Sequence, residues 1–209
     1  MKYELIKSVE ELRNIYDTPS TLALKKQLSE LDKYSIEFLQ LSPFAIISTA
    51  NEVGLLDCSP RGDYPGFIKC LDNKTIAIPD RPGNNRLDNL ANLVVNPNIG
   101  ILVLIPGFKD CLRINGEAGI TTDAQLLATF EYNAKLPKSV ILVSIKEIYF
   151  HCTKAITRSK LWEESARIDR SIMPSLGRIL MGQLDQNKTE AEISEIEKII
   201  EDRVKTTLY

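Results

Sequence analysis

Residues 77 to 93 read AIPDRPGNNRLDNLANL, in which a β-like run ends in a loop of Pro, Gly and Asn that opens into a helical pattern. The loop and the first helical turn supply two guanidinium groups and three amides, those of Arg81, Arg86, Asn84, Asn85 and Asn89. The start of the helix adds unpaired backbone N–H groups and the positive end of its dipole. The stretch therefore predicts a place where a phosphate group could bind.

A plain structural interpretation of the same stretch stays open. Pro-Gly-Asn is an ordinary turn signal, and Asn84 or Asn85 would then do no more than cap the helix. Planar Arg side chains with several donors nevertheless match phosphate oxygens better than a point charge does. The choice between the two interpretations depends on the other basic segments of the chain.

The composition restricts the classes of protein to which the chain can belong. With 209 residues, 44% of them hydrophobic, a single domain with one sizeable core is the default. The formal net charge of −2 gives no overall positive field, so neither nucleic acid nor a membrane surface is expected as a partner. We find no signal peptide and no apolar run long enough to span a bilayer, and we expect a soluble cytoplasmic protein.

The cysteines and the lone histidine argue against metal and hydrolase chemistry. Cys58, Cys70, Cys111 and Cys152 are widely spaced without a CxxC pair, so we expect no metal site and interpret them as reduced, mostly buried residues. His151 is the only histidine, and no nucleophile signature such as GxSxG surrounds a serine or cysteine. We expect His151 to be a structural residue of a β-strand.

Short β-type runs separated by turns begin at residue 44. They cover residues 44–50, 53–58, 67–71, 75–79, 99–105, 111–120 and 140–152. Only two helical patterns interrupt them, one over 84–95 and one that begins after Thr121. At least six short strands with so few helices indicate a mostly antiparallel barrel rather than a βαβ array.

Helical patterns flank this β region on both sides. Before it, we predict a short helix capped by Ser8, a helix over 19–31 with Thr18 as its cap, and a helical turn over 35–41. After it, we predict helices over 159–168 and 189–204, the second with an apolar stripe that should pack on the barrel or on a partner chain. We therefore expect one domain over 1–209, with helices in 1–42, the barrel core in 43–153 and helices in 154–209.

Three further segments carry basic groups where simple strand residues would be usual. They are the loop over 57–66 with Arg61, Arg113 within an apolar strand, and residues 154–162 with Arg158 and Trp162. Each has a structural alternative: a solvated turn, an ion pair of Arg113 with Glu117, and an anchor for the C-terminal helices. Together with the loop over 81–86 they favour a shared site for an anion.

These segments together resemble the pyridoxamine 5′-phosphate oxidase-related, FMN-binding split-barrel proteins, in particular their subgroup of FMN-dependent enzymes of unassigned substrate. The resemblance covers about residues 40–170. The motifs that carry it are DCSPRGDYPGF at 57–67, IPDRPGNNR at 78–86, NP at 96–97, IPG at 105–107, LRING at 112–116 and RSKLW at 158–162. The DRPGNNR and RSKLW segments are specific, whereas NP after a helix is a weak signal.

The resemblance implies a mostly β fold, a six-stranded antiparallel split β-barrel with flanking N- and C-terminal helices, and a homodimer with FMN at the subunit interface. It implies that the following residues bind the cofactor: Ser59, Arg61, Pro79, Asp80, Arg81, Asn84, Asn85, Arg86, Asn89, Arg113, Arg158, Ser159 and Trp162. Arg158 and Trp162 would lie near the flavin ring or the substrate mouth. Asn89 falls near the position of a phosphate-binding lysine in the oxidases proper.

The resemblance also implies a function: an FMN-dependent oxidoreductase that transfers hydride or electrons to or from an unidentified small molecule. The chain lacks the closing Arg-x-His element of the true oxidases, so oxidation of pyridoxamine phosphate is not expected, and no catalytic residue is assigned. The alternative is a module that binds or stores a flavin, a deazaflavin or haem without turnover, although His151 would be the only imidazole for haem.

Overall fold

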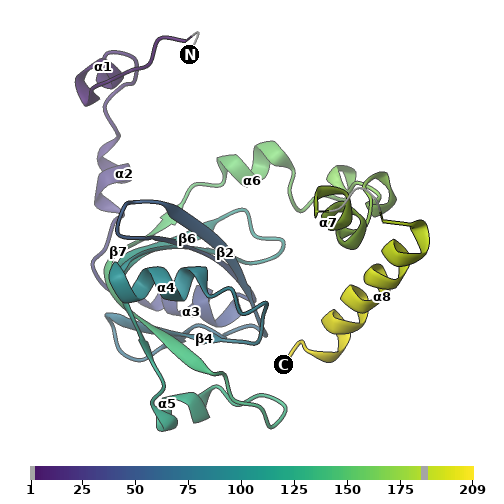
Figure 1. Ribbon diagram of the computed structural model, residues 1–209. Helices are drawn as coiled ribbons and strands as arrows, with labels where there is room; N and C mark the ends of the chain where they lie inside the picture. The colour runs from purple at the N-terminus through teal and green to yellow at the C-terminus, as the bar shows by residue number, and fades with distance from the viewer. Residues whose placement is uncertain (1–2, 185–187) are drawn as a thin grey trace.

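The computed structural model describes residues 3–184 and 188–209, and one antiparallel sheet forms its centre (Figure 1). The strands are β1 Phe44–Ala50, β2 Leu56–Gly62, β3 Lys69–Cys70, β4 Thr75–Asp80, β5 Asn98–Leu104, β6 Cys111–Thr121 and β7 Ser139–His151. Their order across the sheet is β2-β1-β5-β6-β7-β4-β3. The mostly β, antiparallel class is confirmed. The sheet has seven strands in an open order, where the resemblance implied six in a barrel.

The core is a row of branched residues that crosses the middle of the sheet. Register places Ile47 of β1 opposite Ile101 of β5, Ile101 opposite Ile114 of β6, and Ile114 opposite Ile148 of β7. All four side chains are buried. Burial of each contributes roughly 1.5–3 kcal/mol, which fixes the register because a slip by one residue would turn the row outward.

One glycine of the LRING motif has a structural explanation. The pairing of β6 with β7 shifts register between Asn115 and Gly116, as a β-bulge does. A Cβ atom added to Gly116 would collide with the carbonyl oxygen of Ser144 on β7. Glycine is therefore required here by the close approach of the two strands.

The helices and 3₁₀ turns surround the sheet. They are α1 Val9–Arg13, α2 Thr21–Lys25, α3 Lys33–Leu41, α4 Asp88–Val95, α5 Ala124–Thr129, α6 Lys154–Ser159, η1 Glu164–Ala166, η2 Arg170–Ile172, α7 Leu176–Leu184 and α8 Glu190–Thr206. The sheet curls around α3 and α4, with α4 packed against β1 and β6 (Figure 1). The curl brings the edge strand β2 to the end of β4, where Arg61 forms an ion pair with Asp80.

Two predicted helices are wrong in extent. The helix expected over 19–31 is only α2, capped by Ser20 and not by Thr18, because Leu28 leaves it to form a β-bridge with Ile148. The helix expected over 159–168 is not formed: α6 ends at Ser159 with Lys160 as its C-cap, whose φ of 53° lies in the left-handed region, and only the 3₁₀ turn η1 follows within that range. The strand expected over 53–58 also forms later, as β2.

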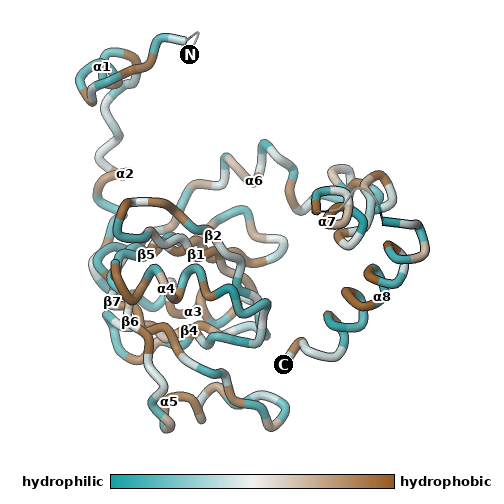
Figure 2. Tube along the Cα trace, viewed as in Figure 1, coloured by the Kyte–Doolittle hydropathy of each residue, from teal (hydrophilic) through white to brown (hydrophobic). Residues whose placement is uncertain are grey.

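The C-terminal helices pack differently from the prediction. α8 begins after its N-cap, Thr189, close to the predicted start, and Figure 2 shows hydrophobic residues recurring along one side of it. That side packs on α7, where Gly177 permits close approach to Glu197 and Ile200. The apolar stripe is therefore used within the chain, on a helix and not on the sheet.

Two further sequence expectations concern cysteine burial and membrane spans. Cys111 is buried, but Cys58 and Cys152 are exposed, and the four cysteines, all within the described ranges, are free. The expectation that most of them are buried is thus wrong. In the described parts of the chain, no helix has both the length and the apolar character to cross a bilayer.

Candidate functional site: a cleft between β2, β4 and α4

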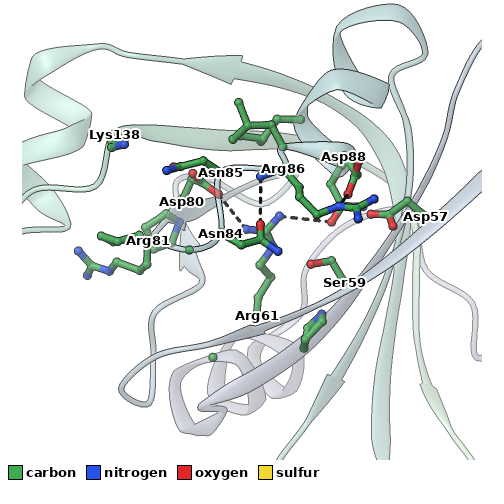
Figure 3. Close-up of a pocket in the computed structure, with 18 of the residues that line it drawn as sticks. Asp57, Ser59, Arg61, Asp80, Arg81, Asn84, Asn85, Arg86, Asp88 and Lys138 are labelled. Atoms are coloured by element: carbon green, nitrogen blue, oxygen red, sulfur yellow. Dashed lines mark hydrogen bonds and ion pairs between the residues drawn. The ribbon is translucent and has the colours of Figure 1, made fainter. Parts of the chain in front are cut away.

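A cleft of about 630 Å³ lies between β2, the end of β4 and the loop over 81–87 that precedes α4 (Figure 3). Its volume falls within the range that suits a small organic ligand. The lining residues are Asp57, Cys58, Ser59, Pro60, Arg61, Gly62, Asp63, Phe67, Pro79, Asp80, Arg81, Pro82, Gly83, Asn84, Asn85, Arg86, Leu87, Asp88, Asn89, Leu90 and Lys138. Nine of the thirteen predicted site residues are therefore brought together.

The polar side chains of β2 reach the cleft because a strand alternates its faces. Asp57, Ser59 and Arg61 are two residues apart, and all three are half-buried while their neighbours along the strand are exposed. Figure 3 shows Arg61 and Ser59 extending from this strand toward the loop before α4. One face of an edge strand thus supplies a carboxylate, a hydroxyl and a guanidinium to the same wall.

Arg61 is held in place by two side chains of the cleft. Its Nη1 donates to Oδ1 of Asp80 at 2.8 Å, and its Nη2 donates to Oδ1 of Asn89 at 3.3 Å. Asn89 is 2% exposed and donates through Nδ2 to the hydroxyl of Thr49 at 2.9 Å. Among the described residues, Nε of Arg61 is one of two buried side-chain polar atoms without a hydrogen-bond partner. An unsatisfied donor of this kind is costly and indicates a missing acceptor.

The loop before α4 holds its residues in an unusual backbone conformation. Asn85 and Leu87 have positive φ angles of 58° and 62°, which Asn tolerates and Leu rarely adopts. Leu87 is also the N-cap of α4 and offers no side-chain hydrogen bond to the helix. The prediction that Asn84 or Asn85 caps this helix is wrong, since Asn84 instead accepts from the backbone N–H of Arg86. The first N–H groups of α4 therefore lack a side-chain cap.

Arg86 lies on the solvent side of the cleft. Its Nε donates to Oδ2 of Asp88 at 2.8 Å, and the guanidinium is largely exposed. Asp88, through this bond and its charge, and more weakly Asp57, raise the pKa of Arg86 above its ordinary value. The guanidinium is therefore always charged and faces two carboxylates (Figure 3).

Arg81 points away from Arg61 and Arg86, to the other side of the loop (Figure 3). Its Nε donates to Oδ2 of Asp63 at 2.6 Å, and its Nη2 is the second buried atom without a partner. Its side chain is 11% exposed and that of Asp63 is 1% exposed. The two arginines of the DRPGNNR motif thus occupy different environments, one buried and one exposed.

The charges that line the cleft balance. Four carboxylates, of Asp57, Asp63, Asp80 and Asp88, face four cations, of Arg61, Arg81, Arg86 and Lys138. A net positive field is therefore not what would hold an anion here. Directed donors would do so instead: the free Nε of Arg61, the guanidinium of Arg86 and the uncapped start of α4.

The other four predicted site residues lie outside the cleft. Arg113 on β6 packs with Cζ 5.1 Å from the ring centroid of Tyr149, and it does not pair with Glu117, whose partner is Lys146. Arg158 and Ser159 of α6 bond to carbonyl oxygens of their own helix, those of Lys154 and Ile156. Nε1 of Trp162 donates to the carbonyl oxygen of Phe108 at 2.7 Å, which anchors the segment after α6. Within one chain these residues do not join the cleft.

Several cleft residues were not predicted. Asp57 and Asp63 lie within the motif at 57–67, so they could have been predicted from their predicted neighbours Ser59 and Arg61. Lys138 gave no signal, because it reaches the cleft only through the pairing of Ser139 on β7 with Asp80 on β4. The described residues contain no cluster of three or more side chains able to ligate a metal.

Comparisons with solved structures found proteins that are similar to part of this chain. Solved structures that resemble it include HupZ from Group A Streptococcus, at 16% identity with a TM-score of 0.47, covering 57% of this chain and 93% of that one. General stress protein 26 from Bacillus anthracis is 17% identical, with a TM-score of 0.40 and coverage of 55% and 88%. An FAD binding protein from Mycobacterium smegmatis is 16% identical, with a TM-score of 0.40 and coverage of 59% and 97%.

At the level of sequence, the chain matches no curated protein. The family model described as pyridoxamine 5′-phosphate oxidase matches residues 31–152, which is more than half of the chain and includes every element of the cleft. The chain therefore belongs to the pyridoxamine 5′-phosphate oxidase family.

Proposed function

We propose that this protein binds FMN in the cleft between β2, β4 and α4 and acts as an FMN-dependent oxidoreductase on a small molecule. Membership in the family supports a flavin phosphate as the ligand. The observation that carries the proposal is the buried, unpartnered Nε of Arg61, next to the uncapped start of α4. Both are donors directed at an anion that the protein itself does not supply.

The donors present fit a phosphate group. Arg61 and Arg86 would bind its oxygens through charge-assisted hydrogen bonds, and Ser59 and the first N–H groups of α4 would add neutral ones. Asp80 and Asn89 hold Arg61 in place before any ligand arrives, which lowers the entropic cost of binding. Asn84 and Asn85, both exposed on the loop, would serve the polar chain that follows the phosphate.

The flavin, when bound, supplies the hydride or electron transfer. The residues of this chain would hold the phosphate, orient the ring and limit access of water to it. We further propose that two copies form a homodimer and that Arg158, Ser159 and Trp162 of one copy approach the cofactor bound by the other. Support for this comes from their separation from the cleft within a single chain, and Arg113 would act in the same way.

The experiment is cofactor uptake followed by reduction. The protein is purified, its absorbance is recorded before and after addition of FMN, and any extracted ligand is identified by mass spectrometry. NADH or NADPH is then mixed with the loaded protein in a stopped-flow instrument. We expect bound FMN that is reduced and is reoxidised by an added acceptor.

Three other results would change the conclusion. A colourless protein that takes up no FMN would contradict the proposal outright. A deazaflavin in the extract would replace FMN as the cofactor, because both present a phosphate to the same donors. Bound FMN that no donor reduces would leave a binding or storage module.

A further inference from the structure

One buried carboxylate joins the cleft to the segment that follows α8. Oδ1 of Asp63 accepts hydrogen bonds from the backbone N–H of Tyr64 at 2.9 Å and from the hydroxyl of Tyr209 at 2.8 Å. Its Oδ2 accepts the bond from Nε of Arg81 at 2.6 Å. A buried charge is tolerated only when it is paired and hydrogen-bonded, so each of these donors contributes to keeping Asp63 and Arg81 where they are.

The ring of Tyr209 covers the same arginine. Cζ of Arg81 lies 5.5 Å from its centroid, as in a cation–π contact. The ring of Tyr132 also contacts that of Tyr209, with 4.6 Å between centroids, and Tyr132 stacks on Tyr64 at 4.9 Å. Nζ of Lys135 also donates to the carbonyl oxygen of Tyr209. Tyr209 is thus fixed by its hydroxyl, its ring and its backbone.

The phenol also stays protonated over a wide pH range. Burial, followed by the hydrogen bond and charge of Asp63, raises the pKa of Tyr209 to about 12. The hydroxyl therefore remains a donor to Asp63 at any ordinary pH.

Tyr209 connects the C-terminal helices α7 and α8 with the cleft, two parts of the chain that otherwise share few contacts. α8 packs chiefly on α7, and in Figure 1 the chain returns from α8 to the side of the sheet where β4 ends. Arg81 is the first residue after β4 and the first of the loop whose left-handed residues, Asn85 and Leu87, precede α4. A strained loop keeps its conformation only when its surroundings fix it.

We propose that Tyr209 is a positioning residue of the cleft, which holds the Asp63–Arg81 pair and through it the conformation of the loop over 81–87. The inference rests on the proposed function for the identity of the ligand. It adds that the chain after α8 tunes the affinity of the cleft for a phosphate-bearing ligand. Tyr209 acts through Arg81 and does not itself contact the ligand.

The test uses two substitutions of Tyr209 and one matched control in the full chain. Tyr209→Phe keeps the ring and removes the hydroxyl, Tyr209→Ala removes both, and Leu208→Ala changes the exposed neighbour. Hydrogen exchange of the 81–87 amides is measured without ligand, and FMN and riboflavin affinities are measured by calorimetry. We expect faster exchange and roughly fivefold or more weaker FMN binding in Tyr209→Ala. Tyr209→Phe should be intermediate and Leu208→Ala unchanged. Riboflavin binding should weaken less than FMN binding, since riboflavin lacks the phosphate and keeps only the polar chain that Asn84 and Asn85 would serve.

The results separate this inference from the proposed function. Unchanged exchange of the loop in both Tyr209 variants would overturn the positioning role, whether or not FMN binds. Equal losses of FMN and riboflavin affinity would also overturn it, because they would indicate general destabilisation. If the wild-type protein took up no FMN but the loop exchanged faster in Tyr209→Ala, the positioning role would stand and the FMN assignment would fail.

Discussion

The loop before α4 and the segment over 154–162 look alike in sequence, and only the first contributes to the cleft. Both place arginines at the start of a helical pattern. The loop is tied to the core at both ends, by the pairing of Asp80 with Ser139 and by the buried Asn89. The segment over 154–162 is also anchored, by the buried Ile156 and by the bond of Trp162 to Phe108, but its Arg158 bonds to its own helix. Anchoring alone therefore does not make a site: the basic side chains must also lie on an element that lines the cleft, as the loop before α4 does.

The largest expected difference between these regions is in FMN affinity. Arg61→Ala removes a preorganised guanidinium and should weaken FMN binding by roughly 1.5–3 kcal/mol, about tenfold to a hundredfold. Arg158→Ala should weaken FMN binding less, because Arg158 lies outside the cleft of its own chain and would reach the cofactor only across the proposed dimer interface. Calorimetric titration of both variants measures this, with circular dichroism to show that they fold. A larger loss of FMN affinity in Arg158→Ala than in Arg61→Ala would contradict this prediction.

The second prediction concerns the anchor of the loop. Asn89→Ala removes the hydrogen bonds to Arg61 and Thr49 from a buried position and should lower the free energy of unfolding by about 1–3 kcal/mol. Asn92→Ala is the matched control, since Asn92 donates to the same Thr49 hydroxyl from a half-buried position and makes no bond to Arg61. Urea unfolding should show the larger loss for Asn89→Ala. Equal losses of unfolding free energy in the two variants would contradict the role of Asn89 as the anchor of the loop.

A smaller effect is expected at the exposed edge of the cleft. Arg86→Ala should weaken FMN binding several-fold, less than Arg61→Ala, because the Arg86 guanidinium is open to solvent. The loss should shrink as salt rises, since exposed charges are screened. Titrations at low and high salt test this, and stability should not change. A salt-independent loss would place Arg86 in a more enclosed contact.

The smallest effect is expected far from the cleft, at His151. Burial, then the charges of Arg113 and Lys26, lower the pKa of His151 from its ordinary 6.5. The folded state therefore binds this proton less readily than the unfolded state, so stability is full above pH 6.5 and falls as the pH drops through the lowered pKa. His151→Asn should flatten this slope slightly, as measured by unfolding at several pH values. An unchanged slope would show that other groups dominate it.

The sequence allowed prediction of the antiparallel strands and of the cleft wall from local patterns. β1 forms over the predicted residues 44–50, and the motifs at 57–67 and 78–86 carry eight of the nine predicted cleft residues because each motif is short and continuous. Lys138 and Tyr209 could not be predicted, since only the pairing of β7 with β4 and the path of the chain after α8 bring them near. The end of the helix at Lys25 escaped prediction for the same reason, because the bridge from Leu28 to Ile148 is a long-range contact.

A direct comparison of FMN with riboflavin tests whether this cleft recognises a phosphate. The two ligands differ only in the phosphate group, so any difference in affinity reports the donors around Arg61. We predict that the wild-type protein binds FMN at least roughly tenfold more tightly than riboflavin and that Arg61→Ala removes most of the difference. Equal affinities of the wild-type protein for FMN and riboflavin would contradict the assignment of the cleft as a phosphate site.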